Sequence, residues 1–403
     1  MAQGAALQRG EEPFPRASAQ APPMPADGAA EAPAESVGAQ ADGQVKPEEL
    51  AARLRATPVH AGLPEGDFIC THHGSFHADE AMACAMLKCL PAYVSMPILR
   101  TRNPAEIEKA AIVVDVGGTY EPSRHRYDHH QASFTETYSE AYADIKLSSA
   151  GLVFKHFGGA VVEALCGPLE ARAQAAILAR TYDTLVRELD AQDNGVQVAD
   201  EPRYRFCTHL GARVGRLNPS WQEPSSPELE NERFKEATLL AAKELCDVVR
   251  GYCCVWLPAR TIVQEALAAR REVHPSGEIM RLPRFCPWQE HLFDLEEEDE
   301  ASRTPLTKYV LLADSRGGWR VQAAPKARGS FELRLPLPKA WCGVRDQELS
   351  DLSGIPGCVF VHANGFIGGN ATEAGVLEMA KKALAMAAEA PDSGATAAAG
   401  AAA

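Results

Sequence analysis

The sequence lacks the features that would place it among secreted or membrane proteins. Its eleven cysteines are an odd number without a Cys-x-x-Cys pair, which argues against a disulfide scaffold and for a reducing, intracellular compartment. No apolar run approaches the length of a membrane span, and the N-terminus has no apolar signal core, so we expect no membrane partner. Glu11 and Glu12 interrupt what would otherwise be a weak transit segment. There is no internal repeat.

Length and composition predict two folded domains between two disordered ends. The chain has 403 residues with 46% hydrophobic content, enough for sizeable cores. Residues 1–64 are rich in Ala, Pro, Gly, Gln and Glu without periodicity, which predicts a disordered tail with at most a short helix at residues 47–55. We expect domains at residues 65–235 and 236–390, and a disordered Ala-rich tail at residues 391–403.

Acidic and basic residues are unevenly distributed. The net charge of −14 disfavours nucleic acid as a partner. Residues 287–300 hold seven acidic residues and no Lys or Arg, whereas residues 301–345 hold nine basic residues and two acidic ones. A phosphate-binding face can therefore be basic although the chain is acidic, and a solvated face of a twisted hairpin is the alternative.

Short apolar strands alternate with helices in the first domain. Strands are predicted at residues 67–71, 94–101 and 111–116, and helices at residues 78–90 and 104–110. This alternation predicts an α/β fold with a parallel sheet covered on both faces. Later helices are predicted to open at residues 148–149 and end at residues 158–159, and to occupy residues 170–190 and much of residues 232–273. The second domain is predicted as a smaller mixed α/β fold, with strands at residues 309–312, 319–323, 330–335 and 358–362 and a closing helix at residues 372–388.

Imidazoles and carboxylates gather in four clusters, without a cysteine pair nearby. Such hard-to-borderline ligands suit two divalent cations, Mn²⁺ in the first place and Mg²⁺ as the alternative, better than a structural zinc. Two of the clusters follow the carboxyl ends of predicted strands, the edge at which open parallel sheets bind ligands. The clustered residues are His72, His77 and Asp79; Asp115; Asp128, His129 and His130; and Asp190 and Asp193.

Asp115 is the predicted centre of the site. A carboxylate at a strand end can bridge two cations about 3.5–4 Å apart, which activate water and hold the oxygens of a phosphoryl displacement. Asp115 could instead only cap the following Gly117–Gly118 turn. Because consecutive side chains in extended chain point in opposite directions, we expect His129 to bind metal and His130 to contact substrate.

Several of the other positions have structural alternatives. Asp128 is expected to orient an imidazole as an outer acceptor. The residue types alone allow His73 in place of His72, and Asp79 could serve only to cap a helix. Asp190 and Asp193 share one helix face, so either could complete the second metal, and the following Asn194–Gly195 is typical of a helix end.

Candidate substrate contacts lie in both domains. The helix opening at Ser148–Ser149 could present backbone N–H groups to a phosphate, or be capped by its own serines. Gly368–Gly369, between a strand and a helix, would let the backbone approach an anion, with His362, Arg334 and Arg345 nearby. An ordinary turn is equally compatible with the glycine pair.

The motifs together resemble the melanocyte-proliferating-gene family of exonucleases, within the DHH phosphoesterase superfamily. The resemblance spans residues 67 to 385. It rests on Thr-His-x-Gly-x-Phe-His-x-Asp-Glu (71–80), Val-Val-Asp-Val-Gly-Gly (113–118), His-Arg-Tyr-Asp-His-His-Gln (125–131), Leu-Ser-Ser-Ala-Gly (147–151), Asp-x-x-Asp-Asn-Gly (190–195), Arg-Leu-Asn-Pro-x-Trp (216–221), Trp-Leu-Pro-Ala-Arg (256–260) and Ser-Gly-Ile-Pro-Gly-Cys-Val-Phe-Val-His-Ala-Asn-Gly-Phe-Ile-Gly-Gly (353–369).

The resemblance implies a DHH-type catalytic domain, an active site in the cleft between two domains, and a two-metal 3′-to-5′ exoribonuclease of RNA processing in mitochondrion or nucleus, with the cytoplasm as an open alternative. Asn or Ser at position 73 in the family favours His72, and the superfamily often has Asp where this chain has His77. By carry-over, one metal takes His72, His77 and Asp115; the other takes Asp79, Asp115, His129 and either Asp190 or Asp193; His130 contacts the scissile phosphate; and Arg345, His362, Gly368 and Gly369 hold the substrate.

Two other functions remain compatible with the same residues. The metals contact only phosphate, so the substrate could be pyrophosphate, a small phosphate ester or a short oligonucleotide instead of single-stranded RNA. A non-catalytic nucleotide-binding module is a third hypothesis, which the complete ligand set disfavours. No particular oligomeric state is predicted.

Overall fold

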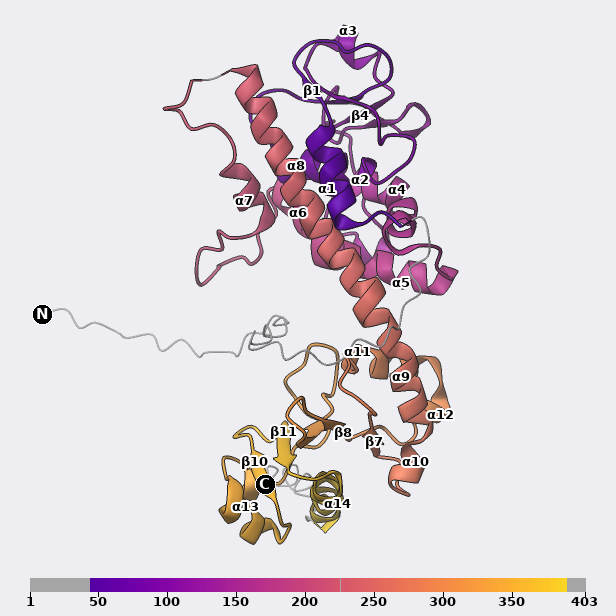
Figure 1. Cartoon of the computed structure of the whole chain (residues 1–403), viewed down its shortest axis with the longest axis vertical. Helices are drawn as coiled ribbons and strands as arrows, with labels where there is room; N and C mark the ends of the chain where they lie inside the picture. The colour runs from indigo at the N-terminus through magenta and orange to yellow at the C-terminus, as the bar shows by residue number, and fades with distance from the viewer. Residues whose placement is uncertain (1–43, 225, 390–403) are drawn as a thin grey trace, which may run out of the picture. The chain divides into compact units, whose positions relative to one another are not determined.

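The structure, a computed structural model, describes residues 44–224 and 226–389. They divide into two compact units, residues 44–257 and residues 258–389, each with its own core (Figure 1). The tail predicted at residues 391–403 and residues 1–43 of the other tail lie outside the described residues. The rest of that tail differs from the prediction, because residues 44–64 fold against the N-terminal unit.

The N-terminal unit is built on a six-stranded sheet in the order β1-β3-β2-β4-β6-β5. Every neighbouring pair is parallel except β5 and β6, so the predicted parallel sheet is confirmed. Strands β1, β5 and β6 were not predicted, since two residues are too short to show a pattern. The strands are β1 (Val59–His60), β2 (Ile69–Thr71), β3 (Ile98–Arg100), β4 (Ile112–Val114), β5 (Tyr120–Glu121) and β6 (Arg126–Tyr127).

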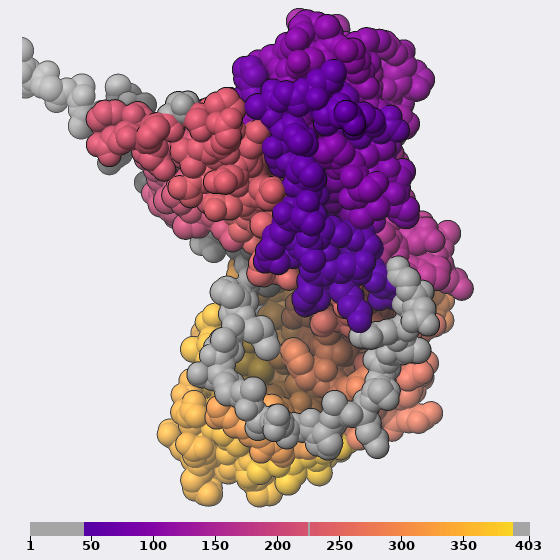
Figure 2. Space-filling view, turned by 45° about the horizontal axis from the view of Figure 1, so that its top comes forward, coloured from indigo at the N-terminus to yellow at the C-terminus, as the bar shows by residue number. Residues whose placement is uncertain are grey.

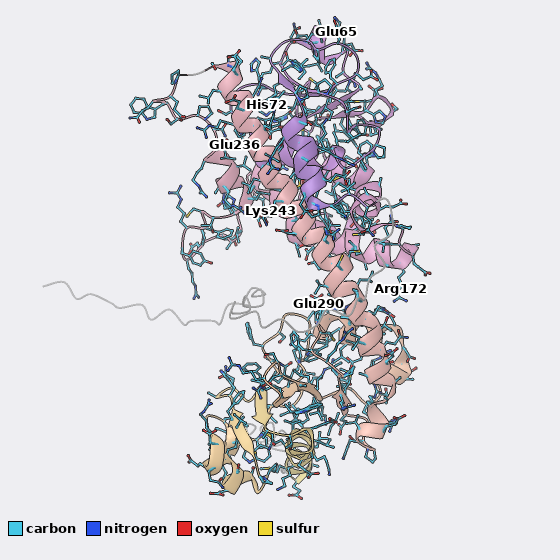
Figure 3. The ribbon with its side chains drawn as sticks, in the orientation of Figure 1. Glu65, His72, Arg172, Glu236, Lys243 and Glu290 are labelled. Atoms are coloured by element: carbon cyan, nitrogen blue, oxygen red, sulfur yellow. The ribbon has the colours of Figure 1, made fainter. Side chains whose placement is uncertain are left out.

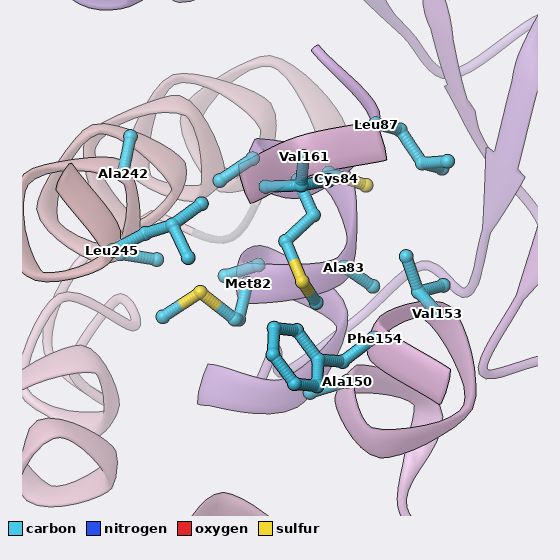
Figure 4. Close-up of a cluster of buried hydrophobic side chains, with 14 of the residues drawn as sticks. Met82, Ala83, Cys84, Leu87, Ala150, Val153, Phe154, Val161, Ala242 and Leu245 are labelled. Atoms are coloured by element: carbon cyan, nitrogen blue, oxygen red, sulfur yellow. The ribbon is translucent and has the colours of Figure 1, made fainter. Parts of the chain in front are cut away.

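Helix α2 (Ala78–Leu87) lies at the centre of this unit. All ten of its residues are buried, and it packs against both α4 (Ser149–Cys166) and α8 (Pro227–Arg250). Figure 4 shows Met82 and Cys84 of α2 among side chains from these two helices. Beyond the two acids of its first turn, α2 is apolar all round, which suits it to such a position, and its alanines let the neighbouring helices approach closely.

Helix α4 is longer than predicted. It runs through the glycine pair at residues 158–159, where we expected it to end, and stops at Cys166. A Cβ on Gly158 would come within 3.1 Å of Leu178 and Phe154, so this glycine permits close packing instead of ending the helix. No single helix in the described part of the chain is long and apolar enough to cross a membrane, although α4 and the stretch Ala171–Asp193 pass that test as a pair bent by 110°.

A π-helical turn, η3 (Tyr182–Val186), joins α5 (Ala171–Thr181) to α6 (Arg187–Asp193). A second one, η4 (Gly251–Trp256), follows α8. The predicted helices at residues 170–190 and 232–273 are therefore present but interrupted. The other short helices of this unit are α1 (Pro47–Ala56), α3 (Pro104–Ile107), η1 (Pro122–Arg124), η2 (Glu140–Tyr142) and α7 (Leu210–Gly215).

The C-terminal unit holds a five-stranded mixed sheet in the order β10-β11-β9-β8-β7. Only β7 and β8 are parallel. Its strands are β7 (Ile279–Arg281), β8 (Tyr309–Ala313), β9 (Trp319–Ala323), β10 (Cys358–Val361) and β11 (Ile367–Asn370). Its helices are α9 (Leu257–Ala268), α10 (Arg270–Val273), α11 (Gln289–Glu298), α12 (Glu300–Arg303), η5 (Lys339–Trp341), α13 (Asp346–Ser353) and α14 (Glu373–Glu389). The predicted mixed α/β fold is confirmed.

The strand predicted at residues 330–335 is wrong. Only Leu333 makes an isolated bridge, with Pro325. The alternating pattern there has another cause: Arg334 is drawn inward by Glu296 of α11, at 2.8 and 2.6 Å, while Leu333 and Leu335 pack against the core. Arg328 likewise pairs with Asp294. Two arginines of the basic segment, Arg328 and Arg334, are thus paired with the acidic segment.

Residues 47–56 belong to the folded N-terminal unit. Shortening a buried side chain of this helix can test that packing. Leu50 is fully buried where α1 packs on α8, and Figure 2 shows the indigo residues of α1 against the rose residues of α8. Leu50→Ala is expected to lower the free energy of unfolding by about 3 kcal/mol, because it leaves a cavity. Arg55→Ala, at an exposed position of the same helix, should change it little. Chemical denaturation measures both, and equal stability of the two variants would contradict the packing.

Candidate metal centre

Three neighbouring parallel strands end at one edge of the sheet, and each delivers metal-binding side chains there. His72 follows β2, Asp115 follows β4, and the Asp128–His130 segment follows β6 (Figure 3 labels His72). Strands β2, β4 and β6 are adjacent in the sheet, so their carboxyl ends lie side by side. The sheet thereby brings together His72 and the Asp128–His130 segment, which are more than fifty residues apart in the sequence.

Asp115 lies at the centre of this arrangement. Its Oδ2 is 3.3 Å from His72 Nε2, and its Oδ1 is 3.4 Å from His129 Nε2 and 3.7 Å from His130 Nδ1. The two oxygens therefore face different imidazoles, as a bridging carboxylate would. The backbone of Asp115 has a φ of 59°, a conformation that Asp tolerates better than most residues and that is often found at functional sites.

Three overlapping groups of ligand atoms, each within 4.8 Å, could hold cations. Asp115 is common to two of them, and His77 is common to two. The groups are His72, His77, Glu80 and Asp115; Asp115, His129 and His130; and His77, Asp79 and Asp193. Because these groups share members, they describe one multinuclear site rather than three separate ones.

Unsatisfied polar atoms show that the site fits a cation. Asp79 Oδ1 and Asp115 Oδ1 are buried without a hydrogen-bond partner among the described residues. A buried polar atom without a partner costs free energy, and two in one cluster fit a bound cation. All the donors are nitrogen or oxygen, the ligand chemistry of divalent cations such as Mn²⁺ and Mg²⁺.

Protonation equilibria indicate that this cluster demands positive charge. Burial would lower the pKa of His72, yet hydrogen bonds to Asp115 and Glu80 raise it to about 10. Burial would likewise lower the pKa of His129, but the carboxylates of Asp115 and Asp193 raise it to about 10. Burial and the surrounding carboxylates, Asp115 first, raise the pKa of Asp79. The carboxylates of the cluster thus favour positive charge beside them, on imidazoles or on cations.

The chain was compared with known proteins. The MYG1 exonuclease family model, described as "Uncharacterised protein family (UPF0160)", matches residues 68–384. The chain belongs to this family. It is 48% identical to the MYG1 protein of Dictyostelium discoideum, over 78% of this chain and 96% of the relative. It is 48% identical to the MYG1 exonuclease of Homo sapiens, over 79% and 85%. The MYG1 protein of Saccharomyces cerevisiae is 41% identical over 79% and 95%. No solved structure matches the chain.

In this MYG1-family chain, the structure separates the two acidic residues that the sequence left as alternatives. Asp193 Oδ2 lies 3.0 Å from His129 Nε2, at the metal site. Asp190 instead faces the N-terminus of α4: its Oδ1 accepts from Ser148 N and Oγ at 2.8 and 2.7 Å. Its Oδ2 accepts from Tyr182 at 2.9 Å. Asp190 is thus a capping carboxylate and lies outside the three ligand groups.

At the α4 N-terminus the hydroxyl groups of both predicted serines are bonded to carboxylates. Ser148 is bonded to Asp190, Ser149 donates to Asp79 Oδ2 at 2.8 Å, and both serines are fully buried. A Cβ on Gly151 would come 2.3 Å from Asp190 Oδ1, so glycine is required for this carboxylate to fit. These residues thus contact Asp190 and the candidate ligand Asp79.

Asp128 contacts both His130 and the Gly117–Gly118 turn. Its Oδ1 lies 2.7 Å from His130 Nδ1, and its Oδ2 accepts from Gly118 N at 2.5 Å. His130 is 60% exposed, whereas His129 is buried. The two consecutive imidazoles thus point to different surroundings, one among carboxylates and one toward an open pocket.

Two site residues were missed by the sequence reasoning. Glu80 is fully buried; its oxygens accept from His77 N at 2.8 and 3.0 Å, and Oε1 lies 3.1 Å from His72 Nε2. Its only signal was its place beside Asp79 at a helix start. Arg102 follows β3 at the same sheet edge and lines the pocket. It forms no ion pair with any described residue. His73, by contrast, is exposed and lies outside the ligand groups.

A pocket of about 310 Å³ opens beside these side chains. The residues that line it are His72, His77, Arg102, Asp115, Val116, Gly117, Gly118, Asp128 and His130. It thus combines metal-binding side chains with an unpaired guanidinium and an exposed imidazole. That combination suits an anionic ligand bound to cations.

The predicted substrate contacts of the C-terminal unit differ in their exposure to solvent. Arg334 is buried in its ion pair with Glu296, so it is a structural residue. Gly368 and Gly369 are buried inside β11, where Cβ atoms would come within 3.0 Å of neighbouring side chains; they permit sheet packing and do not form a turn. Arg345 and His362 are exposed, and their role in substrate binding stays a prediction.

Divalent cations are expected to raise the midpoint of thermal unfolding, because a ligand that binds only the folded state stabilises it. EDTA-treated protein with added Mn²⁺ or Mg²⁺ measures the shift. Asp115→Asn should lose most of it, since Asn removes one charge and one ligand oxygen but tolerates the same backbone conformation. Asp67→Asn, an exposed carboxylate of the same unit, should keep it. Equal shifts in both variants would contradict the site.

Proposed function

We propose that the protein is a metal-dependent phosphodiesterase, acting as a 3′-to-5′ exoribonuclease on single-stranded RNA. The observation that carries the proposal is the convergence of three overlapping ligand groups on Asp115 and His77, beside a pocket that holds an unpaired arginine. Membership of the MYG1 family supports it, because several relatives carry the name exonuclease. The preference for Mn²⁺, the polarity and the choice of RNA rest on the DHH resemblance.

The residues divide into a metal-holding set and a substrate-facing set. His72, His77 and Asp115, with Glu80, would hold one cation; Asp79, His129 and Asp193, with Asp115, would hold the other. Bound divalent cations supply Lewis acidity and a hydroxide from water near neutral pH. Asp115 could contribute to both cation sites because one of its oxygens faces His72 and the other faces His129.

His130 and Arg102 are the groups that would contact the phosphate. Asp128 holds His130 Nδ1 at 2.7 Å, which fixes the ring and leaves the other nitrogen available to donate to a phosphate or leaving oxygen. Arg102 can neutralise charge that develops on the phosphoryl oxygens. Gly118 N is tied to Asp128, so the loop that lines the pocket is fixed to the same carboxylate.

RNA processing in the mitochondrion or nucleus is the setting that we propose from the resemblance. Substrate binding by Arg345 and His362 of the C-terminal unit likewise stays a prediction from the resemblance. A phosphatase for a small phosphate ester or short oligonucleotide is the second candidate, favoured by the pocket volume of about 310 Å³. Hydrolysis rates on RNAs of 5 to 20 nucleotides, with pyrophosphate and dinucleotides beside them, distinguish the two.

Hydrolysis of a 5′-labelled single-stranded RNA with Mn²⁺, Mg²⁺ or EDTA tests the proposal. The expected result is a cation-dependent ladder that shortens from the 3′ end. Asp115→Asn and His129→Ala should each reduce the rate by at least about a thousandfold, because each removes a side chain that holds the cations. Asp67→Asn serves as the matched control and should cleave like the wild type. Undiminished cleavage by either site variant would refute the assignment.

Arg102 gives a second test within the pocket. Arg102→Ala is expected to lower kcat/KM for RNA by roughly a hundredfold, because a positioned donor to developing negative charge is lost. Arg102→Lys should restore part of the activity. The cation-induced thermal shift should stay unchanged in both variants, since Arg102 is exposed and binds no metal. A loss of that shift would mean that Arg102 supports the fold of the site and not the reaction.

A further inference from the structure

Residues 196–209 form a surface loop between α6 and α7, here called the 196–209 loop (Figure 1). Its apolar side chains are unusually exposed: Val198 is 88% exposed, Tyr204 76% and Phe206 50%. In the middle lies the alternating sequence Arg203-Tyr204-Arg205-Phe206, and both arginines are exposed. Large apolar side chains that face solvent in this way mark an interaction site more often than a structural one.

The two ends of the loop are held together at its base. Val196 N donates to Ala191 O at 2.8 Å, and Arg216 donates to Cys207 O at 3.1 Å. A Cβ on Gly211 would come 2.2 Å from Gln192 Oε1, so the glycine lets the start of α7 pack on the end of α6. The segment is therefore a closed surface loop with a fixed base, a type of loop that often carries function.

The base of the loop adjoins the metal centre. Gln192 precedes Asp193, whose carboxylate reaches His129. Beyond α7, Asn218 exchanges two 2.9 Å hydrogen bonds with the backbone of Phe76, next to the ligand His77. Both ends of the segment are thus connected to elements that present candidate metal ligands.

The two arginines of the loop are unpaired, although Asp200 and Glu201 precede them in the same loop. Arg203 and Arg205 form no ion pair with any residue in the described ranges. Other arginines of this unit are neutralised: Arg187 pairs with Asp144, and Arg213 pairs with Glu244. In a chain with a net charge of −14, an exposed and unpaired cationic pair beside an aromatic ring favours an anionic, ring-bearing partner.

We infer that the 196–209 loop binds a single-stranded nucleic acid, with Arg203 and Arg205 contacting phosphates and Tyr204 stacking on a base. The inference rests on the proposed function, which it deepens by naming how a polymer is held outside the pocket. Base stacking on an aromatic ring combined with guanidinium contacts to the backbone is the usual means of binding single strands without sequence preference. Paired bases in a duplex would not offer their faces to Tyr204.

Binding of a fluorescein-labelled 20-nucleotide single-stranded RNA, followed by anisotropy in the non-hydrolysing Asp115→Asn chain, tests the inference. Adding Tyr204→Ala should weaken binding about tenfold, and Tyr204→Phe should restore it. Adding Arg203→Ala with Arg205→Ala should reduce the slope of log affinity against log salt by about 1.4, because two phosphate contacts are lost. Arg55→Ala, an exposed arginine on α1, is the matched control and should bind unchanged.

Unchanged RNA affinity and salt slope in the loop variants would overturn the inference. Loss of self-association in those variants, seen by sedimentation with RNA affinity intact, would also overturn it, in favour of an interface between two copies. Equal affinity for a duplex of the same sequence would count against stacking.

The small ester bis(4-nitrophenyl) phosphate cannot reach the loop from the pocket. Its hydrolysis therefore tests the proposed function without testing RNA binding by the loop. In the otherwise wild-type chain, the loop variants should raise KM for RNA while hydrolysing the small ester normally. Absence of cleavage of both substrates by the wild type would refute the proposed function. The binding assay would then still decide the inference by itself.

Discussion

Crowding of carboxylates around Asp115 is the constraint on which the N-terminal unit depends. Asp79, Glu80 and Asp193 join it in a largely buried cluster, where like charges without compensation are costly. The N-terminus of α2 offsets part of that cost, because its dipole favours the two acids in its first turn. The remainder calls for positive charge, from protons on imidazoles or from cations. The adjacent carboxyl ends of β2, β4 and β6 bring part of this cluster together. The buried helix α2 adds the two acids of its first turn.

A second layer of polar contacts fixes the metal-binding side chains. Asp190 ties the start of α4 to Tyr182, and Ser149 of α4 holds Asp79. Tyr182 opens the π-helical turn between α5 and α6, and such turns are frequent at functional sites because they rotate the residues that follow. In the short helix that follows, Asp190 faces the α4 terminus and Asp193 faces the candidate metal cluster. The Ser-Ser-Ala-Gly motif is thus explained by support of the site, with Gly151 giving the space that the Asp190 carboxylate needs.

Much of the site could be predicted because it follows from backbone topology. Alternating short strands and helices place His72 and Asp115 at one sheet edge, and this rule needs no side-chain detail. Asp190 and Asp193 could not be separated, because residues three apart share a helix face and only tertiary packing decides which neighbour each one meets. Glu80 looked like any acidic residue at a helix start. The alternation near Arg334 imitated a strand because a buried ion pair, which pattern alone cannot distinguish from sheet burial, draws the arginine inward.

The small volume of the pocket implies that different residues would carry out the reaction and bind the rest of a polymer. A pocket of about 310 Å³ is at the lower end of the range for small-molecule sites, roughly 300–1,000 Å³, so only the reacting end of a proposed RNA substrate would fit in it. Contacts to the rest of a strand must come from the surface. If they come from the 196–209 loop, they are made equally in the ground state and the transition state, and they act on KM while Asp115 and its neighbours act on kcat. Changes in the loop would then alter which substrates are used without touching the reaction, and a chain with a short or acidic loop would hydrolyse only small phosphodiesters.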